Sequence, residues 1–83
     1  MISYIFRSVK KDEMYLYLLQ KDGFDSLNDQ LRSVFGKREF VMMINLDKRA
    51  KLARVDINHV KEQLSENGYF LQMPPTPEKL EFD

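Results

Sequence analysis

The segment Ile2-Ser-Tyr-Ile-Phe-Arg-Ser-Val-Lys-Lys-Asp-Glu-Met-Tyr-Leu-Tyr-Leu-Leu19 decides the fold. Apolar side chains alternate along residues 2–9 and again along residues 14–19, and they occupy both faces of each segment. A period of two is typical of β-strands, and the polar run Lys10–Glu13 fits a hairpin loop between them. Strands that are apolar on both faces need cover on both sides of the sheet, so the hairpin predicts helices on each side.

A helix and a third strand follow the hairpin. Apolar residues recur at helical spacing between residues 26 and 35, with Ser26 as the expected N-cap and Gly36 as the residue that ends the helix. Residues 39–45 then contain a continuous apolar run, from Phe40 to Ile44. Such a run is typical of a strand buried on both faces, so we expect it in the centre of the sheet.

Two more helices and a strand complete the pattern. Asp47 is a suitable N-cap for a short helix through residue 53, and Asp56 caps a longer helix over residues 57–67. Residues 69–73 form the last strand. The next two residues are prolines, which cannot donate ladder hydrogen bonds, so residues 74–83 are expected to be a C-terminal tail.

The expected order is strand, strand, helix, strand, short helix, helix, strand. Residues 1–83 therefore form a single domain of the α+β class. Its expected architecture is a three-layer α/β/α sandwich around a four-stranded, mainly antiparallel sheet. A two-layer arrangement is the alternative.

Composition excludes several kinds of protein. The chain has no cysteine, so it offers no disulfide partner and no thiolate zinc site. Its 13 basic and 13 acidic residues give no net charge to attract nucleic acid or anionic lipid. We find neither an apolar run of the roughly 18 residues that a membrane span needs nor a signal peptide, so we expect a cytoplasmic protein without membrane contact.

No motif indicates catalysis or a cofactor. The three glycines are isolated, which excludes a phosphate-binding loop and a dinucleotide fingerprint. His59 is the sole histidine and lies off the apolar stripe of its helix, where a solvent-facing role is the simplest interpretation. We expect no metal and no cofactor, and we favour a non-enzymatic role while leaving an enzymatic one open.

Basic residues are the better candidates for a binding site. Arg7 shares a predicted face with Tyr15 and Tyr17 of the adjacent strand, a cationic and aromatic combination that suits phosphate or stacked bases. The alternative is that both tyrosines pack beneath a helix. Basic residues also cluster in the predicted short helix, as a solvated face or as a contact for nucleic-acid backbone. The candidate binding residues are Arg7, Lys10, Lys11, Tyr15, Tyr17, Lys48 and Arg49.

Several short motifs together resemble one family. The most specific is Gly68-Tyr-x-Leu71-Gln72-x-Pro74-Pro75, and Tyr4-x-x-Arg7-Ser8-x-Lys10, Phe35-Gly36 and Asp56-Ile57 accompany it. This set resembles the YcgL-domain family of small gammaproteobacterial proteins over nearly the whole chain. The resemblance implies an α/β/α sandwich in a bacterial cytoplasm. It implies no reaction, cofactor or catalytic residue.

The sequence thus favours a non-enzymatic interaction module. It would bind a protein or an RNA-containing partner through a basic and aromatic surface that includes Arg7. The alternative is a small enzyme or a protein that binds an anionic small molecule, with a cleft between the sheet and the C-terminal tail. The sequence leaves the oligomeric state open.

Overall fold

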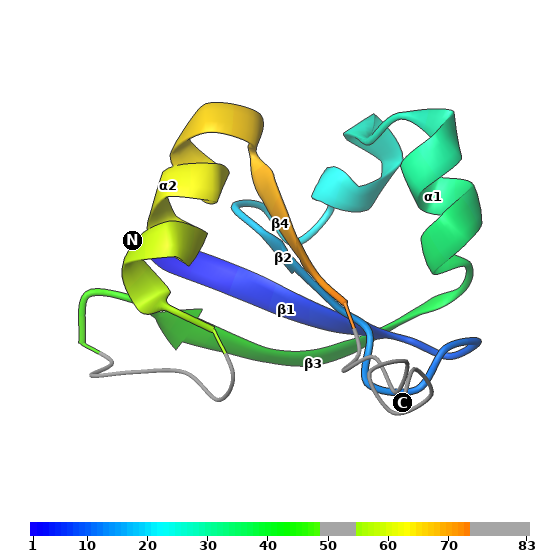
Figure 1. The fold of residues 1–83 in the computed structure, drawn as a ribbon, viewed down its shortest axis with the longest axis horizontal. Coiled ribbons are helices and arrows are strands. Elements are labelled where there is room, and N and C mark those ends of the chain that lie inside the picture. The colour runs from blue at the N-terminus through cyan, green and yellow to red at the C-terminus, as the bar shows by residue number, and fades with distance from the viewer. Residues whose placement is uncertain (49–54, 74–83) are drawn as a thin grey trace, which may run out of the picture.

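The computed structural model describes residues 1–48 and 55–73. It has an α+β fold with four antiparallel strands, and the strands and the two longer helices occur in the predicted order (Figure 1). The predicted short helix after Asp47 lies outside the described residues except for Lys48, which is in a turn. The elements are β1 (Ile2–Ser8), β2 (Tyr15–Leu18), the 3-10 helix η1 (Gly23–Ser26), α1 (Asp29–Phe35), β3 (Arg38–Asn45), α2 (Ile57–Asn67) and β4 (Tyr69–Gln72).

The strand order in the sheet is β3-β1-β2-β4, and all three pairings are antiparallel. The predicted hairpin of β1 and β2 is confirmed, with Tyr4 opposite Leu18 and Arg7 opposite Tyr15. The central position expected for residues 39–45 is wrong, because β3 is an edge strand whose first six residues are exposed. The hairpin itself takes the centre of the sheet, and β3 and β4 pair with its outer sides.

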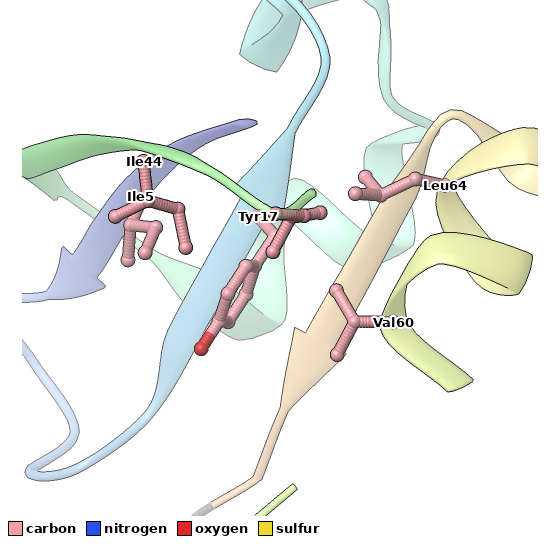
Figure 2. Close-up of a cluster of buried hydrophobic side chains, with 6 residues drawn as sticks. Ile5, Tyr17, Ile44, Val60 and Leu64 are labelled. Carbon is pink, nitrogen blue, oxygen red and sulfur yellow. The ribbon is translucent and has the colours of Figure 1, made fainter. Parts of the chain in front are cut away.

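One cluster of buried side chains joins the sheet to α2. Ile5 and Tyr17 face each other in the β1–β2 register and pack with Ile44 of β3. Val60 and Leu64, both fully buried, point from α2 toward these strands (Figure 2). The predicted apolar stripe of this helix therefore does contact the core.

A second cluster joins the sheet to η1 and α1. Phe6 and Leu16, which are opposite each other in the hairpin, pack with Phe24 of η1 and Phe35 of α1. Ile5 and Phe6 are neighbours on one strand but belong to different clusters, as expected for side chains that alternate between the two faces of a sheet. Figure 1 shows α1 and α2 on either side of β2 and β4.

Capping residues explain where the helices begin and end. The first helix begins later than predicted, because Ser26 belongs to η1 and the N-cap is Asn28, whose Oδ1 accepts a 2.8 Å hydrogen bond from the Leu31 amide. Gly36 ends α1 as predicted, with φ of 74° and its amide bonded to the Arg32 carbonyl at 2.9 Å. Asp56 caps α2 as predicted.

Candidate binding surface

The hydroxyl of Ser8 holds the loop between β1 and β2. Ser8 is buried at the end of β1, and its Oγ accepts hydrogen bonds from the amides of Lys10 at 3.2 Å and Lys11 at 3.0 Å. The same hydroxyl donates to the carbonyl of Phe35, the last residue of α1, at 2.6 Å. One side chain thus fixes the loop backbone to the sheet and to a helix end, so the two lysines project from a defined position.

The beginning of β3 brings two further basic residues to the same place. The Val9 amide donates to the Lys37 carbonyl at 2.9 Å, and Arg38 is opposite Ser8 in the β1–β3 register. The Lys10 Cδ lies only 3.0 Å from the place that a Cβ on Gly36 would take. We call the resulting group the basic end of the molecule; its members are Arg7, Lys10, Lys11, Lys37 and Arg38.

Two of these cations already have partners within the chain. Arg7 forms an ion pair with Glu39, its register neighbour on β3, and both side chains are about half exposed. The Arg38 guanidinium lies 4.5 Å from the centre of the Phe24 ring, a cation–π contact. Lys10, Lys11 and Lys37 are exposed. Positive charge at the basic end is therefore presented mainly by the three lysines, beside the exposed Asp12 and Glu13 of the same loop, while the two arginines also stabilise the fold.

The two candidate tyrosines occupy different environments. Tyr15 is half-buried and packs against the α2 cluster, opposite Arg7. Tyr17 is only 5% exposed, its ring packs edge-on against Phe70, and its hydroxyl donates to Gln72 Oε1 at 3.1 Å. The packing alternative therefore describes Tyr17, which is too buried to stack on a base, and we leave it out of the proposed surface.

Lys48 lies at the other end of β3, and Arg49 lies outside the described residues. The Lys48 amide donates to the Asn45 carbonyl at 3.1 Å, and Asn45 is opposite Ile2 rather than Ser8. The ladder between these two ends has a length of about 20 Å at 3.3 Å per residue. Lys48 therefore lies at the opposite end of the sheet from Arg7, Lys10 and Lys11, and it is not part of the basic end.

A small charge network occupies the end of the sheet near Lys48. The Asp47 carboxylate forms ion pairs with the Met1 ammonium and with Lys61 of α2, the second at 2.8 Å. The hydrogen bond from Lys61, followed by the one from the Met1 ammonium, lowers the pKa of Asp47 from 3.8 to about 2. These two ion pairs attach the start of β1 and the end of β3 to α2. No local pattern of residues indicates this network, because its three members come from distant segments.

Two shallow hollows lie away from the basic end. One, of about 250 Å³, lies among the ends of β2 and α2 and η1, and is lined in part by Leu18, Leu27 and Asn67. The other, of about 310 Å³, lies between α1 and β4. The described residues that line these hollows are uncharged, and Arg7 and His59 are not among them. Within the described part of the chain, neither lining offers a group that would hold an anion or transfer a proton.

Other features limit the chemistry of the described residues. His59 packs its ring edge-on against Phe70, with 5.6 Å between the ring centres. Within residues 1–48 and 55–73, no group of three or more His, Cys, Asp or Glu side chains is arranged to hold a metal ion. The helices in that part of the chain are all too short or too polar to cross a membrane.

Comparison with known proteins identifies the family. Residues 3–75 match the profile of the YcgL domain. The chain belongs to the YcgL family. A YcgL domain-containing protein of Vibrio cholerae is 45% identical over 80 residues, which cover 96% of this chain and 86% of that protein. Protein YcgL of Escherichia fergusonii is 46% identical over the same share of this chain and 82% of its own length, and a Yersinia enterocolitica YcgL domain-containing protein is 45% identical over 96% and 89%.

The YcgL match confirms the family resemblance found in the sequence. The matched range includes β1 from Ser3 onward, all of β2 to β4, the Ser8 hydrogen bonds and the five members of the basic end. These YcgL relatives are bacterial, and their names specify a domain but no reaction or ligand.

Proposed function

We propose that this protein is a non-enzymatic interaction module that binds an acidic surface of a protein partner through its basic end. The observation that carries the proposal is the position of Ser8, whose three hydrogen bonds fix a loop with two exposed lysines beside a third lysine. Fixing the backbone of the loop that carries the lysines reduces the conformational entropy lost when a partner binds. The site combines defined geometry with charge.

Two features favour a protein over an RNA-containing partner. Recognition of single-stranded RNA commonly uses exposed aromatic rings for base stacking. Near this end Tyr17 is buried, and the ring of Phe24 is covered by the Arg38 guanidinium. The half-exposed ring of Phe40 packs against Phe6 and has the Lys21 ammonium 4.6 Å from its centre, so it is not free for a base. The chain also has no net positive charge, whereas nucleic-acid binding depends strongly on phosphate neutralisation. Binding to RNA is retained as an outcome of the test below.

We infer that the two buried clusters are the two interfaces of a three-layer α/β/α sandwich, with α2 on one side and η1 and α1 on the other. The supporting observation is that neighbouring residues of β1 contribute to different clusters. We place the interaction in the bacterial cytoplasm, in keeping with the bacterial relatives and the cysteine-free sequence.

A matched pair of charge reversals tests the proposed surface. Lys11→Glu reverses one cation of the basic end, and Lys48→Glu makes the same charge change at an exposed site at the other end of β3. Partners recovered from bacterial extract on the wild-type protein are identified, purified and titrated against each variant. We expect Lys11→Glu and the Lys10→Glu/Lys11→Glu double variant to weaken binding at least tenfold, and Lys48→Glu to leave it unchanged.

The same titrations separate the alternatives. Equal affinity of the wild type and the double variant for every purified partner would refute the basic end as the site. Recovery of RNA, with binding that weakens steeply as salt is raised, would refute the protein partner but keep the surface.

A further inference from the structure

The outer edge of β3 is unusually apolar for an exposed strand. Phe40–Met43 are four consecutive apolar residues with exposed fractions of 39–54%. The sequence has no charged residue between Glu39 and Asp47. Among the residues that the structure describes, the sheet has no strand beyond β3. Proteins usually protect such an edge with charges or prolines, because its free backbone groups readily pair with another strand.

Two hydrogen bonds determine which backbone groups of β3 point outward. The Leu46 amide donates to the Met1 carbonyl at 2.8 Å, and the Val9 amide donates to the Lys37 carbonyl at 2.9 Å, so residues 46 and 37 face β1. Inward and outward positions alternate along an antiparallel strand. Counting from both ends with the observed register gives four residues whose backbone groups face the outer edge: Arg38, Phe40, Met43 and Asn45.

A β-bulge makes the spacing of these outward groups distinctive. Ile5 is opposite Met42 and Phe6 is opposite Phe40, so Val41 is an extra residue in β3. The steps along the chain from Arg38 to Phe40, to Met43 and to Asn45 are consequently two, three and two residues long. A regular strand, whose outward groups recur every second residue, cannot match this series along its whole length. A second copy of β3 in antiparallel orientation matches it, because the series reads the same in both directions.

We propose that β3 pairs with β3 of a second copy of this chain about a two-fold axis between Val41 and Met42. Arg38 is then opposite the partner's Asn45, and Phe40 is opposite the partner's Met43. Directly opposed residues share a face of the sheet, so each aromatic ring contacts a methionine side chain. The two sheets become one continuous sheet, and the contact is isologous.

The exposed apolar area of β3 limits the size of the interface that this dimer can form. Four half-exposed side chains, at about 200 Å² for each large side chain, offer about 350 Å² of apolar surface per copy, so the two copies together offer on the order of 700 Å². Stable interfaces bury at least about 1,200 Å², so this contact belongs with weak and reversible associations. The chain has no net charge to oppose association. We therefore expect a dimer that dissociates in the micromolar range or above, and this inference does not depend on the proposed function.

Sedimentation velocity over a concentration series from low micromolar to submillimolar tests the dimer. Met43→Lys places a charge at the paired position, and Met73→Lys is the matched control, because Met43 is 54% and Met73 is 58% exposed. The sedimentation coefficient is expected to rise with concentration for the wild type and Met73→Lys, and to stay at the monomer value for Met43→Lys. A wild type that remains monomeric throughout, or a Met43→Lys variant that associates like the wild type, would overturn the proposal.

Single cysteines test the register, because the native chain has none. Met42→Cys lies beside the proposed axis, within the roughly 4.4–6.8 Å Cα separation that a disulfide spans, so oxidation is expected to link two copies. Asn45→Cys lies far from the axis and is expected to stay unlinked. Efficient linking through position 45 would contradict this register. A monomer whose Phe40 and Met43 amides exchange slowly would show that another part of the same chain covers the edge, which also contradicts the proposal.

Discussion

Replacing Ser8 with alanine tests whether one hydroxyl fixes the basic loop. The substitution removes one hydrogen bond to the Phe35 carbonyl and two from the amides of Lys10 and Lys11. A typical hydrogen bond contributes about 0.5–1.5 kcal/mol net, and the two loop amides partly regain water as partners. The expected loss is about 2–3 kcal/mol of unfolding free energy, which lowers the melting temperature of a domain this small by roughly 10–20 °C.

Ser3→Ala is the matched control on the same strand. Ser3 is as buried as Ser8, but its hydroxyl makes a single hydrogen bond, to the Leu18 carbonyl at 3.1 Å. The Ser3→Ala variant should lose about 1 kcal/mol of unfolding free energy. Urea unfolding followed by circular dichroism gives both free energies, and amide exchange reports the loop directly. The reasoning is refuted if Ser8→Ala costs no more than Ser3→Ala, or if the Lys10 and Lys11 amides keep their wild-type exchange rates.

Two further predictions concern charge and backbone conformation. The Asp47 carboxyl should titrate near pH 2, and since its pKa is lowered by folding, its stabilising effect should be complete above about pH 3.8 and disappear as the pH falls through 2. Carbon-detected NMR measures this, and a midpoint near 3.8 would show that the ion pairs do not form in solution. Gly36→Ala should lower the unfolding free energy by about 2–3 kcal/mol, because Gly36 combines φ of 74° with ψ of −148°, a region almost restricted to glycine. Gly68→Ala should lower it by only about 1 kcal/mol, because Gly68 has the left-handed helical conformation. Equal losses in urea unfolding would contradict this explanation.

Local patterns in the sequence predicted the elements well. The two-faced alternation of residues 2–19 identified the hairpin and placed Arg7 beside Tyr15. This succeeded because side chains alternate between the two faces of a strand wherever the strand lies in the sheet. Asp56 was identified as a cap because its hydrogen bond is made within the helix it begins. The error at Ser26 arose because Ser26 and Asn28 are both good N-caps, and the η1 turn that ends at Ser26 has no strong local signal.

Properties that depend on strand order could not be predicted from local patterns. A continuous apolar run is typical of a buried strand, yet β3 lies at the edge, because its neighbours are decided by pairing between distant segments. The same pairing brings Lys37 and Arg38 to the basic end and carries Lys48 away from it. The burial of Tyr17 likewise depends on how α2 packs against the hairpin.

An amide chemical-shift titration with polyglutamate and, separately, with single-stranded poly-U RNA tests the central claim most directly. We predict that polyglutamate shifts the amides of Lys10, Lys11, Lys37 and Arg38, and that the Lys10→Glu/Lys11→Glu variant loses these shifts. RNA should produce smaller changes at the same salt concentration. Shifts that centre on Lys48 and α2, or shifts that persist in the double variant, would contradict the claim that the basic end is the binding surface.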